Sequence, residues 1–255
     1  TSYEHAVEEL HNKFYMSIRQ KLKACDTTRF AVFAIAPMPL LIQLGSFLGD
    51  AVSAVIYQKQ RDKGWKWDDS APDRKFKITS PNKTADKKPV LLMMLTDKID
   101  VTRIHETLGE DVAIWTISAD YHGYDFILKR HHLESFKATA RSVIDDVLKH
   151  YPNGEALHIF PIMPASACVE FGRIRTASHN PWVIYEKRRD TVNYVKTISI
   201  KSGHFFLFNL FVNYVSGSEL LHNIINTYAH FHHHNHNVVV KVCNFVDSFL
   251  LVVIL

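Results

Sequence analysis

FAVFAIAPMPLLIQLG, which begins at residue 30, and LHIFPIMPASACVEFG, which begins at residue 157, decide the fold. When they are aligned with an offset of 127 residues, the two stretches match at apolar positions, at Pro37 with Pro164 and at Gly45 with Gly172. In each stretch an apolar run leads through a proline turn into a second apolar run, as a buried strand leads into a helix. The match predicts that the chain builds one strand-turn-helix unit twice.

The match continues on both sides of these stretches. Downstream, Val55–Tyr57 recurs as Val183–Tyr185 once a single-residue insertion is allowed. Upstream, apolar residues recur with helical period between Val7 and Leu22 and again between Phe136 and Tyr151. A shared order of helix, strand, turn, helix and strand is hard to obtain by chance. The competing explanation is that buried strands rich in Val, Ile and Phe always look alike, but the matched proline and glycine positions favour a duplication.

Two further apolar runs, Val90–Thr96 and Val112–Ser118, lie between the copies. They do not alternate with polar residues, which is typical of strands buried on both faces in a parallel sheet covered by helices. We therefore expect an α/β fold of two fused Rossmann-like units with parallel-type sheets and a pseudo-two-fold internal duplication. The polar stretch of residues 65–89 is interpreted as a linker or surface excursion between the units.

The composition is typical of a globular protein but does not identify a binding partner. The chain has 255 residues, of which 47% are hydrophobic, which is ample for a core. A net charge of +4 permits anionic ligands but falls short of the dense basic character of a duplex-DNA binder. The three cysteines are far apart and form no CxxC pair, so a disulfide framework and a zinc ribbon are not supported. We expect a cytoplasmic protein, and we see no secretory leader.

The candidate ligand site follows from strand order. In an open parallel sheet, ligands bind outside the carboxyl ends of the strands, so the turns after the strands should line one shared mouth. A helix that starts just after Pro39 or Pro164 offers unpaired N–H groups to an anion, and a phosphate group is the expected ligand. Neither copy contains GxGxxG or GxxxxGK[ST], so we expect neither a dinucleotide fold nor a P-loop of the usual form.

Side chains near the mouth suit nucleotide recognition. Trp65 could stack on a base, and Arg61, Lys98 and Lys187 could meet phosphates. A structural interpretation competes at each position, because a tryptophan in a WKW alternation is equally typical of a half-buried strand and single cations are usually solvated.

These residues also carry a resemblance to a known family. AVFAIAPMPLLIQLGSFLGD with VIYQKQRDKGWKW, and ALHIFPIMPASACVEFGRIR with PWVIYEKRRD, resemble the two signature blocks of the SAVED domain. That domain is the ligand-sensing part of effectors in bacterial CBASS anti-phage systems and of some CRISPR-associated effectors. The resemblance implies two fused CARF-like halves, at about residues 1–75 and 86–195, within a sensor domain of residues 1–200.

The resemblance implies a function of antiviral defence. A cyclic oligonucleotide, typically a cyclic trinucleotide, would bind between the halves and drive self-association that activates an attached effector. That effector is most often an N-terminal nuclease, which this chain lacks, and such an attachment would explain a chain that begins at Thr1. The chain itself would then be a bacterial cytoplasmic sensor and not an enzyme, with no cofactor, metal or membrane partner and with DNA contacted only by the effector.

The expected binding residues come from two arguments. Carried over by position, the signature blocks place five residues in the pocket: Met38, Pro39, Pro164, Ala165 and Ser166. Strand-end geometry adds Gln58, Arg61, Trp65, Thr96, Lys98, Asp120, Tyr121, Tyr185 and Lys187.

Residues 201–255 differ in composition from the rest and are interpreted as a non-homologous C-terminal extension of unknown role. They hold seven of the sixteen histidines, and the cluster between His230 and His236 could bind a metal adventitiously. The final apolar stretch is long enough for a membrane anchor, but Lys241, Asn244 and Asp247 are costly in hydrocarbon.

Two enzymatic alternatives remain. A CARF-type ring nuclease would cleave its cyclic oligonucleotide, with His122 and Lys98 as the available groups. A nucleotide-sugar or NAD enzyme would need the glycine fingerprint that is absent. Because the chain shows no compact constellation of acid and base, a binding module is the leading interpretation.

Overall fold

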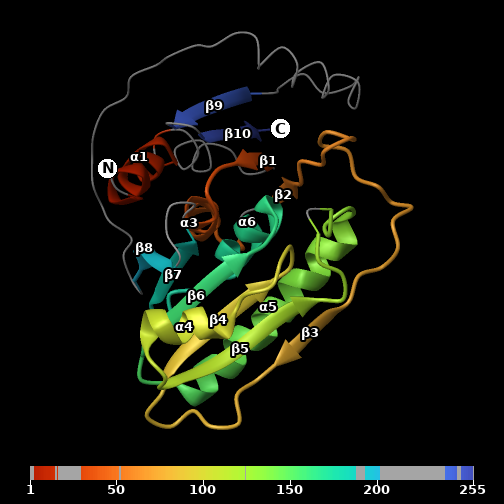
Figure 1. Ribbon diagram of the computed structural model, residues 1–255. Coiled ribbons are helices and arrows are strands. Elements are labelled where there is room, and N and C mark those ends of the chain that lie inside the picture. The colour runs from red at the N-terminus through yellow and green to blue at the C-terminus, as the bar shows by residue number, and fades with distance from the viewer. Residues whose placement is uncertain are drawn as a thin grey trace.

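In the computed structural model, two β-sheets lie on either side of a pair of crossing helices (Figure 1). The structure describes residues 3–14, 16, 30–51, 53–123, 125–187, 193–201, 239–245 and 248–254. The protein is therefore an α/β protein, as the sequence predicts.

The larger sheet has six strands in the order β3-β5-β4-β6-β7-β8. Their bounds are Phe76–Thr79 for β3, Lys88–Met94 for β4, Val112–Ala119 for β5, Leu157–Ile162 for β6, Trp182–Lys187 for β7 and Tyr194–Ile200 for β8. The four central strands are parallel, and both edge strands are antiparallel to their neighbours. The expected buried strands appear as β4 and β5, but the sheet is mixed, and the supposed linker of residues 65–89 contributes the edge strand β3.

The smaller sheet has the order β2-β1-β10-β9. Strand β1, Phe30–Ile35, pairs in parallel with β2, Ala54–Tyr57, and antiparallel with β10, Ser248–Ile254, which in turn pairs with β9, Val239–Phe245. Part of the tail thus extends the sheet of the first half. The histidine cluster of residues 230–236 lies outside the described residues. Within the described part of the chain, no helix is long and apolar enough to cross a membrane.

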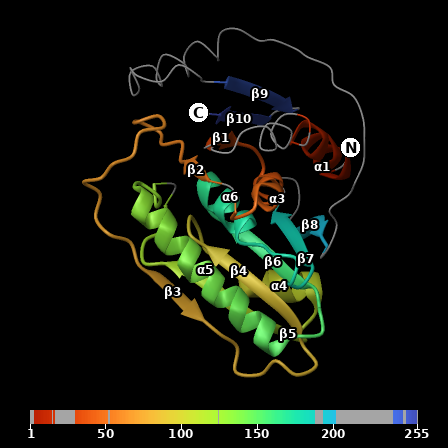
Figure 2. The ribbon, with the colours of Figure 1, turned by 180° about the vertical axis from the view of Figure 1, so that it is seen from behind.

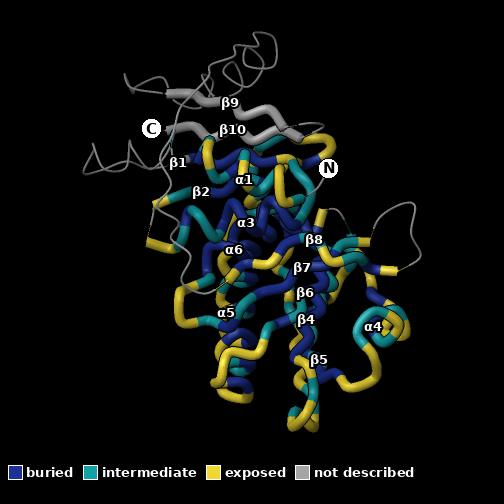
Figure 3. The backbone as a smooth tube through the Cα atoms, turned by 90° about the vertical axis from the view of Figure 1, so that its left-hand side faces the viewer, coloured by how far each residue is buried: buried dark blue, intermediate teal, exposed yellow. Residues whose placement is uncertain are grey.

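Five described helices cover the sheets. Their bounds are Tyr3–Phe14 for α1, Met38–Leu48 for α3, Val101–Leu108 for α4, Arg130–His150 for α5 and Ala165–Arg173 for α6. Helices α3 and α6 lie between the sheets and are buried along most of their lengths (Figure 3). Helix α5 lies along one face of the larger sheet, and α4 lies on the other face (Figure 2).

One order of elements occurs twice, as α1-β1-α3-β2 and as α5-β6-α6-β7. Both copies hold the same group of rings. Phe33 stacks on Tyr57 with ring centroids 4.5 Å apart, and Phe160 stacks on Tyr185 at the same distance. A third ring stands perpendicular to each phenylalanine, that of Trp65 at 5.2 Å and that of Tyr194 at 5.0 Å. This correspondence supports the interpretation of an internal duplication.

The two halves meet where α3 crosses α6. Gly45 and Gly172 occupy equivalent positions in these helices, and each is the residue at which the two backbones touch. A Cβ atom added to either glycine would lie 2.9 Å from the Cα atom of the other, and closer still to a carbonyl oxygen of the opposite helix, that of Val169 or Ile42. The matched glycines therefore serve a close crossing of helices between the halves.

Candidate functional site

Both crossing helices begin at the carboxyl end of a strand. Helix α3 follows β1 through Pro37, and α6 follows β6 through Pro164. Each proline is extended, with φ and ψ of −54° and 141° for Pro37 and −61° and 155° for Pro164, so the chain turns sharply from strand to helix. In α3 the residue after Met38 is Pro39, which has no N–H to donate, whereas α6 has Ser166 at that position. The two helix starts are thus chemically unequal.

A polar junction joins the halves at this end. The side-chain carbonyl of Gln58, which follows β2, accepts hydrogen bonds from the Ser166 hydroxyl at 2.8 Å and from the Ser166 backbone N–H at 3.1 Å. The Gln58 amide group donates to the Lys59 carbonyl at 2.9 Å. Gln58 is 7% exposed and Ser166 is 1% exposed, so the junction is closed to solvent. An oxygen atom from the first half thus satisfies a free N–H group in the first turn of α6.

The segment after β2 continues across to the second half. The Gln60 side chain and the Asp68 N–H both donate to the Leu128 carbonyl, at 3.2 Å and 2.8 Å. Lys129 then pairs with Asp73 at 2.7 Å. Residues 58–73 are therefore fixed against the loop that leads into α5, and Arg61 is exposed at the turn between Gln60 and Gly64.

Several of the other expected residues lie near the carboxyl ends of the strands or in the first turns of the crossing helices. Thr96 lies beside the carboxyl end of β6, because its N–H donates to the Ile162 carbonyl at 3.2 Å. Lys98 and Lys187 are exposed close to the carboxyl ends of β4 and β7. Met38 and Ala165 are partly buried against the larger apolar cluster, and Pro39 and Pro164 are buried.

Asp120 and Tyr121 follow β5 but interact with the chain that leads into β3. The Asp120 carboxylate accepts from the Lys75 N–H at 3.1 Å. The Tyr121 hydroxyl donates to Asp125 at 3.0 Å, and the Arg74 guanidinium lies 4.5 Å from the centre of the Tyr121 ring. The hydrogen bond to Asp125 and its charge raise the pKa of Tyr121 above its usual value. No described contact brings these two residues to the junction of Gln58 and Ser166.

Tyr185 and Trp65 lie in packed aromatic groups. The Tyr185 ring is buried on the α4 face of the larger sheet, stacked on Phe160, and its hydroxyl lies 3.0 Å from Nδ1 of His158. Burial lowers the pKa of His158 to about 4, with smaller contributions from Lys88 and Lys196. Trp65 is half-buried against Phe33, with the Lys59 ammonium 5.7 Å from its ring. No described contact joins Tyr185 to the junction of Gln58 and Ser166.

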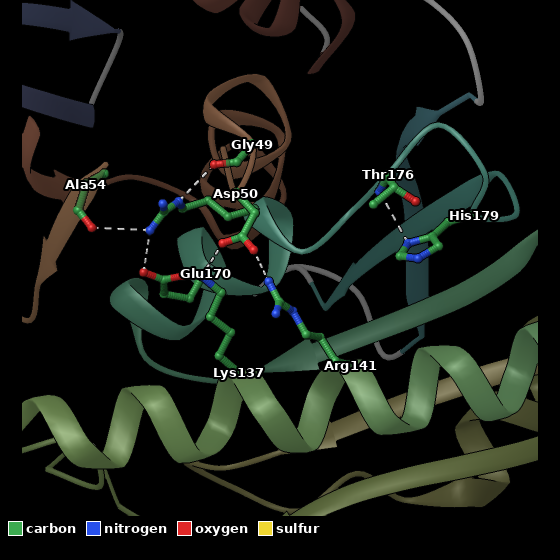
Figure 4. A network of polar contacts seen from close by, with 9 residues as sticks. Gly49, Asp50, Ala54, Lys137, Arg141, Glu170, Thr176 and His179 are labelled. Atoms are coloured by element: carbon green, nitrogen blue, oxygen red, sulfur yellow. Dashed lines mark hydrogen bonds and ion pairs between the residues drawn. The ribbon is translucent and has the colours of Figure 1, made fainter. Parts of the chain in front are cut away.

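The structure also contains a polar network that the sequence reading did not select. It joins Asp50, at the end of α3, to Lys137 and Arg141 on α5, and joins Lys137 to Glu170 on α6 at 3.1 Å (Figure 4). Arg173 binds Glu170 at 2.7 Å and also donates to the carbonyls of Gly49 at 3.1 Å and Ala54 at 3.3 Å. Burial raises the pKa of Asp50, but the hydrogen bond and charge of Lys137 and those of Arg141 outweigh it and hold this pKa below its usual value.

A cavity of about 360 Å³ adjoins this network. It is bounded by the start of β2, the first turns of α5 and the last turns of α6, and its lining is of mixed character: Asp50, Ser53, Ala54, Val55, Ile56, Arg130, Leu133, Glu134, Lys137, Glu170 and Arg173. Glu170 and Arg173 are 6% and 4% exposed. The Glu-x-x-Arg spacing in α6 is the one signal of this network that can be read in the sequence, since it places both side chains on one helix face.

The structure is that of an α/β protein in which two sheets pack on a pair of crossing helices. The family model of the SMODS-associated and fused to various effectors sensor domain, SAVED, matches residues 10–200. The chain belongs to the SAVED family. The resemblance carried by the two signature blocks is thereby confirmed.

Solved structures show the same fold. The chain is similar to the Cap4 SAVED/CARF-domain containing receptor of Acinetobacter baumannii, with 12% identity and a TM-score of 0.56 over 79% of this chain and 42% of that chain. A structure of that receptor with the cyclic trinucleotide 2′3′3′-cAAA also has 12% identity, with a TM-score of 0.50 over 64% of this chain and 36% of that one. The chain thus spans about two-fifths of the receptor at most. No curated protein matches the chain.

Proposed function

We propose that this chain is a cytoplasmic sensor of a cyclic oligonucleotide, with a cyclic trinucleotide as the first candidate, and that binding between the halves drives self-association. In the full-length protein this assembly activates an attached effector, for which an N-terminal nuclease is the first candidate. The observation that carries the proposal is the junction of Gln58 and Ser166. It joins the carboxyl end of β2 in the first half to the start of α6, which follows the carboxyl end of β6 in the second half, where we expect the ligand to bind. Family membership and the receptor fold support it.

The proposed contacts divide by chemistry. The start of α6 and the cations Lys98, Lys187 and Arg61 suit the phosphates of a ring, because charged donors bind phosphate oxygens strongly. Met38, Pro39, Thr96, Pro164 and Ala165 form the walls near the helix starts. Trp65, Asp120, Tyr121 and Tyr185 each have a partner within the chain, so each would have to rearrange before touching a ligand.

The first test is a panel of cyclic di-, tri- and tetranucleotides, each read by thermal shift and by mass from light scattering. A ring present at 100 times its Kd should stabilise the chain by about 2.7 kcal/mol. We expect one ring to raise both the melting temperature and the mass. Stabilisation without a change in mass would contradict self-association, and no stabilisation by any ring would contradict the sensor.

Matched variants sharpen this test. Lys98→Ala removes an exposed cation at the mouth, and Lys77→Ala removes an exposed cation on β3. Loss of one charged hydrogen bond to phosphate should weaken binding about tenfold for Lys98→Ala and leave Lys77→Ala unchanged. Chromatography of the ring after long incubation tests the ring-nuclease alternative, since a sensor returns it intact.

A further inference from the structure

Helix α6 is held by the first half at both of its ends. At its first turn, Ser166 donates twice to Gln58. At its last turn, Arg173 donates to the carbonyls of Gly49 and Ala54. The nine residues of α6 form one continuous helix, and every residue from Ser166 to Arg173 is buried. A displacement of one end must therefore appear at the other, because a helix this short moves as a single body.

Between its two ends, α6 crosses α3 through a contact of backbone atoms. At Gly45 and Gly172 the two backbones touch, and neither glycine has a side chain that could interlock with the opposite helix. Interlocking side chains are what hold most packed helices in register. A small shear of α6 along α3 therefore meets less resistance at this point than in ordinary packing.

The far end of α6 has two arrangements within reach. Lys137 lies on α5 between two carboxylates, Asp50 at the end of α3 and Glu170 on α6, and it pairs with both. The adjoining cavity of about 360 Å³ gives the Lys137, Glu170 and Arg173 side chains space to change rotamer. If α6 moves relative to α5, the distance from Glu170 to Lys137 changes, so the ion pair of Lys137 with Glu170 changes in strength relative to its ion pair with Asp50.

We propose that α6 couples the mouth to this polar network: release of Ser166 by Gln58 shifts α6 and transfers Lys137 from Glu170 toward Asp50. A ligand that displaces Gln58, as in the proposed function, would then be sensed at the end of α3. The coupling is nevertheless a property of the ligand-free chain, so its test needs no nucleotide and does not depend on the proposed function.

A double-mutant cycle provides the test. Gln58→Met keeps the side-chain length but removes the acceptor for Ser166, and Asp50→Asn removes the exposed charge that holds Lys137 and Arg141. Among the described contacts, Gln58 and Asp50 have no hydrogen-bond or ion-pair partner in common. The effects of such independent sites on the unfolding equilibrium constant normally multiply to within a factor of about two. For this pair we expect the effect of the double variant on the unfolding equilibrium constant to differ from the product of the single effects by about fivefold, which is about 1 kcal/mol. Urea denaturation of the full chain measures it.

A matched control removes a hydrogen bond that α6 does not touch. The Tyr151 hydroxyl donates to the carbonyls of Thr84 at 2.7 Å and Lys87 at 2.8 Å. When Tyr151→Phe is combined with Gln58→Met, the unfolding equilibrium constant should change by the product of the two single effects to within twofold. If the double variant of Gln58→Met and Asp50→Asn also matches the product of its single effects to within twofold, the coupling is overturned. A departure that the control shares would also overturn it, because the effect would then be general.

Hydrogen exchange gives a second readout that needs only one mild variant. Ser166→Ala removes the hydroxyl donor and leaves the backbone contact with Gln58. We expect faster exchange in residues 49–51 and 53–56, beside the far end of α6, and unchanged exchange in α4. Faster exchange confined to residues 58–60 and 165–168 would show that the change stays local and would refute the proposal.

Discussion

The two units share a backbone but differ in the polar pair that their central helices carry. In α3 the Gln43 amide donates to the Ser46 hydroxyl at 3.0 Å, and the equivalent pair in α6 is Glu170 with Arg173, 2.7 Å apart. Both pairs are spaced i, i+3. The charged pair also reaches across to the other unit, where Arg173 donates to the Gly49 carbonyl at 3.1 Å. The same helix crossing thus accommodates an uncharged pair in α3 and a charged pair in α6. The charged pair adds hydrogen bonds between the halves.

The largest effects should come from the ring groups that the units share. Phe160→Ala removes a fully buried ring that stacks on Tyr185, and Phe33→Ala removes its counterpart, which is 5% exposed. Each should lower the free energy of unfolding by about 3–5 kcal/mol, measured by urea denaturation. Ile78→Ala is the control, since Ile78 is 43% exposed and should change stability by about 0.5 kcal/mol or less. A cost under about 1 kcal/mol for Phe33→Ala would break the equivalence of the units.

The glycine crossing should give the next largest effect. Gly45→Ala and Gly172→Ala each place a methyl group against the opposite backbone, which cannot move aside without moving its helix. We expect a loss of about 2–3 kcal/mol for either change. Gly64→Ala is the matched control: its φ is 63° but the space around it is open, so only about 1 kcal/mol of backbone strain should result. Unequal costs at the two crossing glycines would show that the halves do not share the contact evenly.

The smallest effect is a pH dependence that belongs to one unit. The second unit has His158 where the first has Ala31. The pKa of His158 is about 4 in the folded chain and near 6.5 when unfolded, so the unfolded chain binds the proton first as the pH falls. Stability from this group is complete above pH 6.5 and decreases toward pH 4, by about 1 kcal/mol over the whole range because partial exposure screens it.

Urea denaturation between pH 7 and pH 4 measures this slope. His158→Gln should flatten the decrease, and the exposed His131→Gln should leave it unchanged. An identical slope in the two variants would assign the decrease to other groups.

The repeated unit could be predicted from sequence because its matches are local. The proline turns and the glycine crossing recur with one spacing, and they specify β1, α3, β6 and α6. Helix α4 was not predicted, although its boundaries are marked by Asp100, which caps the Thr102 N–H at 3.0 Å, and by Gly109 with a φ of 90°. Strand β3 was missed because its four residues lie within a polar stretch and its exposed face resembles a loop.

The candidate site was less predictable than the fold. Tyr185 lies within the matched strand β7, and both faces of that strand are apolar, so the pattern could not tell which face each side chain occupies. Period-two alternation places Tyr185 with Val183 on the α4 face, away from the crossing helices. The network of Asp50 and Lys137 joins residues 87 positions apart, a pairing that no local pattern encodes.

The glycine contact has a consequence for how such a sensor can diversify. In a dimer of identical subunits, one codon sets the residue on both sides of a two-fold axis, so every substitution is made twice. Here each side has its own codon. Gly45 and Gly172 are alike because the backbones leave no alternative, whereas Pro39 and Ser166, six residues earlier in each helix, differ. Fusion into one chain thus allows a nearly symmetric scaffold to present unequal groups to its partner.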